Sequence, residues 1–171
     1  FLEDLSREIS TVKANRIPPE HYYSGCCPDE VFRCIYRGYV DLCRRNRLLD
    51  FDDMLTCCYD LLKEREDVRR AWQQKFQYIL VAEFQDINQL QYDTIRLLAQ
   101  PENNLFVVGD DDQSIYHFRG ARPEIMLNFS KDFPTAQRVL LDVNYRCSGE
   151  ILQSALSLIG HNEKRFRKKL K

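Results

Sequence analysis

The spacing of apolar residues predicts that the first half of the chain is helical. From Phe1 to about Asn15 the apolar positions recur every three or four residues, which is the period of an amphipathic helix. Residues 17–28, which contain three prolines and a glycine, end this pattern because proline has no amide hydrogen to donate within a helix. A second helix is predicted from Pro28 to about Asn46, with an apolar face formed by Val31, Ile35, Tyr39 and Leu42.

Two more helices are predicted before the middle of the chain. Asp50 directly precedes residues 51–64, in which apolar residues again follow helical spacing. An aspartate at this position can accept a hydrogen bond from a free amide of the first helical turn, so Asp50 is predicted to be the N-cap. Residues 66–76 show the same period and predict one further helix.

The second half of the chain alternates strand and helix patterns. Strands are predicted at residues 77–82, 103–110 and 137–146, and helices at 88–100, 122–133 and 148–160. The first strand is an almost continuous apolar run, which predicts that both of its faces are covered. This alternation predicts an α/β fold with a parallel sheet and right-handed crossovers, preceded by a helical segment.

The carboxyl ends of the predicted strands carry most of the polar residues that suggest chemistry. The sequences at these ends are EFQD, GDDDQ and NYR. Ligands of parallel α/β sheets bind at the carboxyl ends of the strands. We therefore expect the functional site at this edge of the sheet.

Composition narrows the class of protein. The chain has 171 residues, 44% of them hydrophobic, which is enough to form a core. It has no apolar run of about 18 residues and no signal peptide pattern, so no membrane partner and a cytoplasmic location are expected. The seven cysteines include two adjacent pairs and no CxxC, which favours reduced thiols over a metal site. The start at Phe1 suggests processing or a piece of a longer chain.

Charge is distributed unevenly along the chain. Residues 161–171 contain six Lys or Arg against Glu163, a charge of +5, which leaves −6 for the remainder of a chain whose net charge is −1. A basic segment of this kind can contact a phosphate backbone. A solvated tail is an equally good interpretation.

The acidic residues after the first strand favour nucleotide chemistry. Paired carboxylates that follow a buried strand suit a Mg²⁺–nucleotide site, where one acid binds the ion and the other activates the attacking water. Glu83 is the candidate general base, but Ala82 precedes it and cannot bind a cation. The alternative is that Glu83 and Asp86 cap the following helix.

The second strand leads into the segment VVGDDDQSIYHFRGA, residues 107–121. Gly109 allows a tight turn, and three consecutive aspartates require a cation or a basic partner. Gln113 can sense a phosphate. Aromatic residues interleaved with arginine suit single-stranded nucleic acid, because bases stack on aromatic rings. For Phe118 alone, a place in the core is the default interpretation.

The segment LDVNYRC, residues 141–147, adds two candidates. Tyr145 could stack on a base, and Arg146 could reach a transferring phosphate. The alternative is an ordinary pair of surface residues.

Taken together, these segments resemble one family. ILVAEFQDINQLQY, LFVVGDDDQSIYHFRGA and LDVNYR, in this order and spacing, resemble motifs II, III and IV of the UvrD/Rep-type superfamily 1 DNA helicases. LLDFDDML, residues 48–55, also resembles the motif of that family just upstream of the Walker B strand. The resemblance covers nearly the whole chain and implies a RecA-like motor that moves along single-stranded DNA with ATP and Mg²⁺, in the 3′–5′ direction.

The resemblance also implies roles for individual residues. Glu83 matches the hydrolytic base, and Gln85 and Gln113 match residues that link the γ-phosphate to the DNA site. Tyr145 matches the residue that stacks on adenine, and Arg146 matches an arginine that contacts the γ-phosphate. The region that contacts DNA corresponds to Tyr116, Phe118 and Arg119.

The sequence departs from the family pattern at several points. The magnesium-binding aspartate corresponds to Ala82, so no metal ligand is expected there. His117 and Phe118 stand where the family commonly has Gly and Trp. No glycine is followed by lysine, so the phosphate-binding GxxxxGK[ST] loop is absent. The chain is therefore expected to be an internal piece with a partial P-loop NTPase motor domain, inactive and without tightly bound nucleotide on its own.

The resemblance divides the chain into three segments and leaves three candidate functions. Residues 1–47 are expected to end an inserted helical subdomain, 48–141 to form part of a first RecA-like motor domain, and 142–171 to begin a second. The expected partners are single-stranded DNA, DNA junctions and the remaining helicase domains of the same chain. The alternatives to a helicase are a non-catalytic nucleic-acid-binding remnant and the helicase part of a helicase–nuclease.

Overall fold

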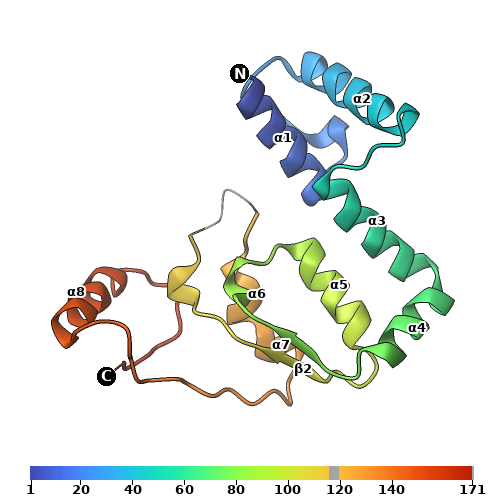
Figure 1. Ribbon diagram of the computed structural model, residues 1–171. Helices are drawn as coiled ribbons and strands as arrows, with labels where there is room; N and C mark the ends of the chain where they lie inside the picture. The colour runs from blue at the N-terminus through green and yellow to red at the C-terminus, as the bar shows by residue number, and fades with distance from the viewer. Residues whose placement is uncertain (116–119, 171) are drawn as a thin grey trace.

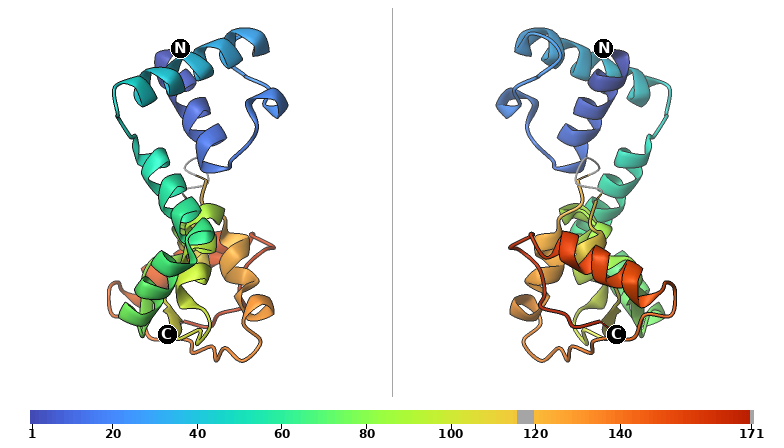
Figure 2. Two further views of the ribbon diagram at one scale, coloured as in Figure 1. Left: turned by 90° about the vertical axis from the view of Figure 1, so that its right-hand side faces the viewer. Right: turned by 90° about the vertical axis from the view of Figure 1, so that its left-hand side faces the viewer.

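A computed structural model describes residues 1–115 and 120–170 of the chain. A pair of helices, α1 (Leu2–Ala14) and α2 (Asp29–Arg45), lies at one end of the molecule, and a short 3₁₀ turn, η1 (Pro19–His21), lies between them in sequence. A small sheet lies at the other end (Figures 1 and 2). Both predicted helices are present with nearly the predicted bounds.

The pair α1–α2 has its own core. Leu5, Ile9, Val12 and Phe32 are buried together. Of the predicted apolar face of α2, Val31 and Leu42 are exposed and lie outside this core. Phe32 defines the buried face instead, since its large ring packs against the Tyr22 ring at a centroid distance of 5.1 Å, and Ile35, Tyr36 and Tyr39 pack on the same core.

Helix α3 (Phe51–Glu64) joins this pair to the rest of the molecule (Figure 1), and α4 (Glu66–Lys75) follows it. The predicted N-cap at Asp50 is confirmed. Its side chain accepts a hydrogen bond from the Asp53 amide at 2.7 Å, and the Asp53 carboxylate accepts one from the Asp50 amide at 3.4 Å. This reciprocal capping box satisfies two amides that the helix itself leaves free.

Strands β1 (Ile79–Val81) and β2 (Leu105–Val107) form the sheet, and they are parallel, as predicted. One face is covered by α5 (Gln89–Ala99), α6 (Pro123–Leu127) and α7 (Phe129–Asp132). The core beneath them consists of Phe84, Ile87, Tyr92 and Ile125, with Val81 and Val107 of the strands packed against it.

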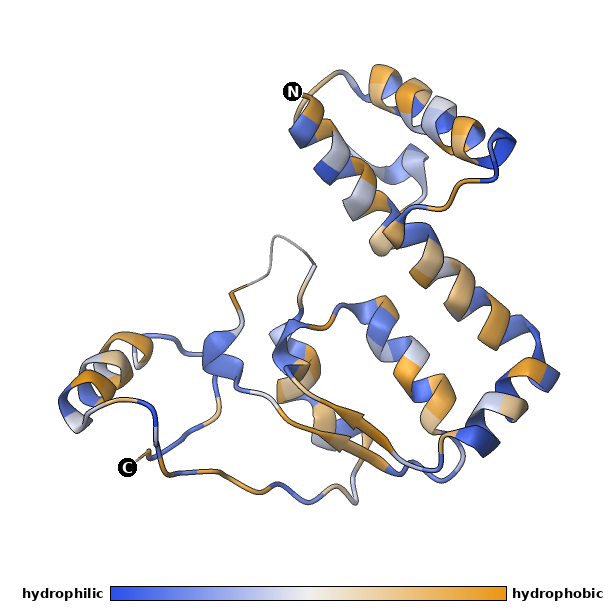
Figure 3. Cartoon of the chain, viewed as in Figure 1, coloured by the Kyte–Doolittle hydropathy of each residue, from blue (hydrophilic) through white to orange (hydrophobic). Residues whose placement is uncertain are grey.

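The prediction that both faces of the first strand are covered was wrong. Leu80 and Phe106 are partners in the strand register, and they are 72% and 62% exposed. Their side chains point away from the helices because successive residues of a strand face opposite sides. An apolar band runs along these strands (Figure 3), so the continuous apolar pattern belongs to a sheet with one uncovered face in this chain.

The third predicted strand is also wrong, because residues 137–146 have no regular secondary structure. The side chains of Val139 and Leu141 are both exposed. A strand requires a neighbour that pairs with its backbone groups, and the described sheet consists of β1 and β2 alone. The mixed α/β class is confirmed, with a parallel sheet of two strands in the described residues.

The last predicted helix is present as α8 (Gly149–Ile159), with Ser148 before it and Gly160 after it. The described residues include no helix that is both long and apolar enough to span a membrane.

Candidate functional site

The carboxyl ends of β1 and β2 bring the two acidic segments together. The Val108 amide donates to the Val81 carbonyl at 2.8 Å, and the Phe84 amide donates to the Val108 carbonyl at 2.9 Å. A 3₁₀ turn follows each strand, η2 (Phe84–Asp86) after β1 and η3 (Asp111–Gln113) after β2. The two turns therefore lie side by side at the edge of the sheet where the sequence predicts the site.

Glu83 is the residue that enters the first of these turns. Its backbone has φ +52°, in the left-handed region that residues with a Cβ rarely adopt. The side chain is exposed, and its Oε2 atom accepts a hydrogen bond from Gln85 Nε2 at 2.8 Å. The alternative role as a cap of the next helix was wrong, because Asn88 caps α5 through a capping box with Gln91.

Gln85 connects the two turns. Its side chain is buried, with 1% of the residue exposed. Oε1 accepts from the Asp110 amide at 3.0 Å, while Nε2 donates to Glu83 and, at 3.3 Å, to Asp86 Oδ2. Gln113 is exposed, and its Nε2 donates to Asp110 Oδ2 at 2.8 Å. Glu83, Gln85 and Gln113 thus belong to one connected set of hydrogen bonds through Asp110.

The three consecutive aspartates have a basic partner far along the chain. Lys168 forms ion pairs with Asp110, Asp111 and, at 3.1 Å, with Asp112. Arg165 donates two hydrogen bonds to Asp112, at 2.8 and 2.5 Å. The carboxylate of Asp111, 1% exposed, also accepts from the Phe166 amide at 2.7 Å. We call this cluster of five charged side chains the acidic-turn clamp.

The clamp shifts the pKa values of Asp110 and Lys168. Burial acts to raise the pKa of Asp110, but hydrogen bonds from Lys168 and Gln113 outweigh it, so the pKa is lowered overall. For Lys168, burial acts to lower the pKa, but the three carboxylates outweigh burial and raise it. Both shifts favour the charged forms, so the clamp is held by ions.

This arrangement decides between the two interpretations of the basic segment only in part. Arg165 and Lys168 are engaged by the aspartates, whereas Lys164, Arg167 and Lys169 are exposed and open to phosphate. Sequence reasoning did not find this pairing. The need of the aspartates for a cation was its only signal, because no local pattern links residues more than 50 positions apart.

The other candidates lie elsewhere or outside the described residues. Tyr145 is 92% exposed, and Arg146 is also exposed. The Asn144 side chain shapes this bend, since its Oδ1 accepts from the Arg146 amide at 2.8 Å. Tyr116, Phe118 and Arg119 lie outside the described residues.

The described residues do not fit a resident magnesium ion at this edge. The Ala82 side chain offers no oxygen ligand, and the aspartates of the second turn are already paired with Lys168 and Arg165. Within residues 1–115 and 120–170, no group of three or more His, Cys, Asp or Glu is arranged to hold a metal. An ammonium and a guanidinium group provide positive charge at the acidic turn.

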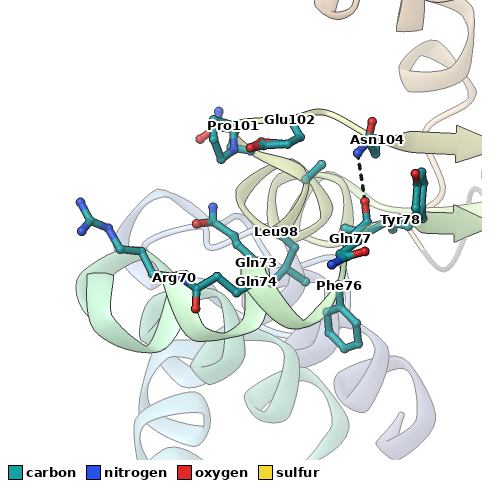
Figure 4. A pocket seen from close by; sticks show the side chains of 13 residues that line it. Arg70, Gln73, Gln74, Phe76, Gln77, Tyr78, Leu98, Pro101, Glu102 and Asn104 are labelled. Carbon is teal, nitrogen blue, oxygen red and sulfur yellow. Dashed lines mark hydrogen bonds between the residues drawn. The ribbon is translucent and has the colours of Figure 1, made fainter.

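A cleft of about 720 Å³ lies at the opposite edge of the sheet. It is lined mainly by side chains that surround the starts of β1 and β2, including Arg70, Gln73, Tyr78 and Asn104 (Figure 4). Several of its amide groups already have partners, as when Asn104 Nδ2 donates to the Gln77 carbonyl at 3.1 Å. Because it lies at the starts of the strands, the cleft is separate from the acidic turns at their ends.

Comparison with known proteins identifies the family. A family model described as the UvrD/REP helicase N-terminal domain matches residues 2–134. The chain is 42% identical over 164 residues to the ATP-dependent DNA helicase PcrA of Leuconostoc citreum, 44% over 172 to the ATP-dependent DNA helicase Rep of Escherichia coli, and 39% over 163 to DNA helicase II of Salmonella typhimurium.

These matches cover 95%, 99% and 95% of the chain. The chain spans only 22%, 26% and 23% of the length of the same relatives. The family model covers well over half of the chain, including both strands and both acidic turns. The chain belongs to the UvrD/Rep helicase family.

Proposed function

We propose that this chain is part of an ATP-dependent DNA helicase, to which it contributes half of the hydrolysis site and part of the path of single-stranded DNA. One observation carries the proposal: in a chain of this family, the carboxyl ends of two parallel strands bring Glu83 and Gln85 against the turn that leads into residues 116–119. Single-stranded DNA and DNA junctions are the proposed substrates.

The proposed roles of the residues follow the family pattern. Glu83 acts as the hydrolytic base, Gln85 and Gln113 connect it to the DNA path, and Arg146 contacts the γ-phosphate. Tyr145 stacks on adenine, and its high exposure leaves its ring free for such a contact. DNA contacts are assigned to Tyr116, Phe118 and Arg119.

The fold also supports a proposed organisation. Helices α1 and α2 have one core, and the sheet with α5, α6 and α7 has another, which suits a helical subdomain at residues 1–47 and a RecA-like motor domain at 48–141. Residues 142–171 would begin the second motor domain. All seven cysteines are free thiols, which fits the proposed cytoplasmic location.

The first test is binding of this chain to fluorescent oligo-dT, measured by anisotropy at low and moderate salt. Binding is expected to weaken as salt rises, because contacts of Lys and Arg with phosphate release counterions. Phe118→Ala should weaken it about 5- to 150-fold, since one stacked base contributes about 1–3 kcal/mol. Tyr23→Ala removes an aromatic ring that is 80% exposed in the helical pair and should leave binding unchanged. Equal losses in both variants would contradict the assignment of Phe118.

Ala82 favours a second candidate function, a non-catalytic nucleic-acid-binding member of the family. The two candidates separate in a chimera in which this chain replaces the matching segment of Escherichia coli Rep. If the site is catalytic, Ala82→Asp should raise DNA-stimulated ATP hydrolysis about 100-fold or more, because an aspartate there supplies a ligand for the metal that stabilises the transition state. Adding Glu83→Gln should remove the gain. A chimera that stays inactive but still binds DNA supports the non-catalytic role.

A further inference from the structure

We propose that Gln85 is a positioning residue: its buried carboxamide holds the Glu83 carboxylate in place from the turn that follows β2, and Gly109 makes this arrangement possible. The inference rests on the proposed function only in taking Glu83 as the hydrolytic base.

The carboxamide of Gln85 uses both of its ends. Oε1 accepts from the Asp110 amide, which belongs to the second turn, and Nε2 donates to Glu83 and Asp86, which belong to the first. The side chain is 1% exposed, so water does not compete for these bonds. A buried polar group with all its partners in place is held in one orientation, because each lost bond leaves an unsatisfied group.

Gly109 leaves the space that this carboxamide occupies. A Cβ at position 109 would lie 2.7 Å from Gln85 Oε1, 3.1 Å from the Phe84 amide nitrogen and 3.2 Å from the Gln85 amide nitrogen. The first distance is a severe overlap, and the other two involve backbone that cannot easily move. Glycine is therefore required here because of close approach to the first turn, rather than for an unusual φ angle.

The same first turn anchors both sides of the segment that contains residues 116–119. Ser114 Oγ donates to the Gln85 carbonyl at 3.2 Å, and the Arg122 amide donates to the Ile87 carbonyl at 3.0 Å. Gln85 thus contacts the second turn through its side chain and its backbone. A change at Glu83 has a short, hydrogen-bonded route to the residues on which this segment is anchored.

The backbone and the side chain of Glu83 both depend on their surroundings. A residue with φ +52° in the left-handed region costs about 1–2 kcal/mol, so it persists only where its surroundings hold it. The side chain is exposed, and Gln85 Nε2 is the buried group that fixes one of its oxygens. Removing that donor should release the carboxylate while leaving the apolar core intact.

The test uses NMR spectroscopy of the isotope-labelled 171-residue chain. The first measurement is the scalar coupling across the hydrogen bond from the Asp110 amide nitrogen to the Gln85 side-chain carbonyl carbon, which is expected to be present. The second is the shift of the Asp110 amide signal caused by Glu83→Gln. It is expected in the native chain and should be lost in Gln85→Met, which keeps the size of the side chain but removes its hydrogen bonds.

Matched variants separate positioning from folding. Gln74→Met removes an exposed carboxamide from α4 and should leave the effect of Glu83→Gln on Asp110 intact. Gly109→Ala should abolish the coupling across the hydrogen bond, whereas Gly38→Ala, with nothing within 4 Å of its added Cβ, should keep it. The proposal is overturned if the coupling is absent from the native chain, or if Glu83→Gln still shifts Asp110 in Gln85→Met.

These measurements need neither nucleotide nor DNA. If Gln85→Met does not fold, the coupling in the native chain and its fate in Gly109→Ala still decide the proposal. A chain that shows the coupling but fails to bind single-stranded DNA would contradict the proposed DNA path on this chain and leave the positioning role of Gln85 in place.

Discussion

Replacing Lys168 with methionine is expected to lower the free energy of unfolding by about 3 kcal/mol, because removal of one partner from a buried ionic cluster leaves uncompensated charge. The Lys168 side chain is 9% exposed and is paired with three carboxylates. Methionine preserves most of the apolar stem, so the loss is one of charge and hydrogen bonds. Urea unfolding followed by the fluorescence of Trp72, the single tryptophan, measures it.

The neighbouring residue provides the control for this experiment. Lys169→Met removes the same charge from an exposed position, where a lone surface charge contributes at most about 0.5 kcal/mol. If the two variants are equally stable, the acidic-turn clamp does not exist in solution. The free energy of unfolding of Arg165→Met should lie between those of the two variants, because Asp112 would keep its contact with Lys168.

The clamp also predicts how stability depends on pH. Because the pKa of Asp110 is lowered in the folded chain, its contribution is complete above the unfolded value of about 3.9 and is lost as pH falls through the folded pKa. The raised pKa of Lys168 gives a contribution that is complete below about 10.4 and is lost as pH rises through the folded pKa. Lys168→Met should therefore be less stable than the native chain at neutral pH, and its free energy of unfolding should fall less as the pH is lowered.

The second large effect is expected at the joint between the helical pair and α3. Lys13→Met should lower stability by about 2–3 kcal/mol, because Lys13 is 7% exposed and pairs with Asp50 at 2.5 Å and Asp53 at 2.7 Å. Asp50 also accepts from the Tyr39 hydroxyl at 2.7 Å while it caps α3. The loss of Lys13 therefore weakens the contact of three helices at once.

Hydrogen exchange locates this effect as well as measuring it. In Lys13→Met the amides of α1 and α2 should exchange faster, while those of α5 keep their protection. Arg7→Met is the matched control, since Arg7 also pairs with two acids, Glu3 and Asp4, but is 72% exposed. Exposed pairs contribute about 0.5 kcal/mol or less. Similar exchange in the two variants would show that the burial of Lys13 adds nothing.

The first half of the fold was predictable from local signals in the sequence. The N-cap at Asp50 and the bounds of α1 and α2 depend on hydrogen bonds and apolar spacing within a few residues, which any sequence displays directly. The meeting of the two acidic segments was predictable as well. Parallel strands end at the same edge, so EFQD and GDDDQ had to meet there once β1 and β2 paired.

Other features depended on contacts between distant parts of the chain. The exposed face of Leu80 and Phe106, and the lack of a strand at residues 137–146, follow from which neighbours the sheet has, and an apolar run does not specify its neighbours.

The sequence by itself determined the family, the edge of the sheet at which the two acidic segments meet, and the presence of Glu83, Gln85 and the three aspartates in these segments. Only the tertiary structure decided that Gln85 is buried between the two turns and that Lys168 forms ion pairs with aspartates 56 to 58 positions earlier in the chain. The physical reason is that hydrogen bonds of side chains and ion pairs depend on distance in space, and a linear pattern records only distance along the chain.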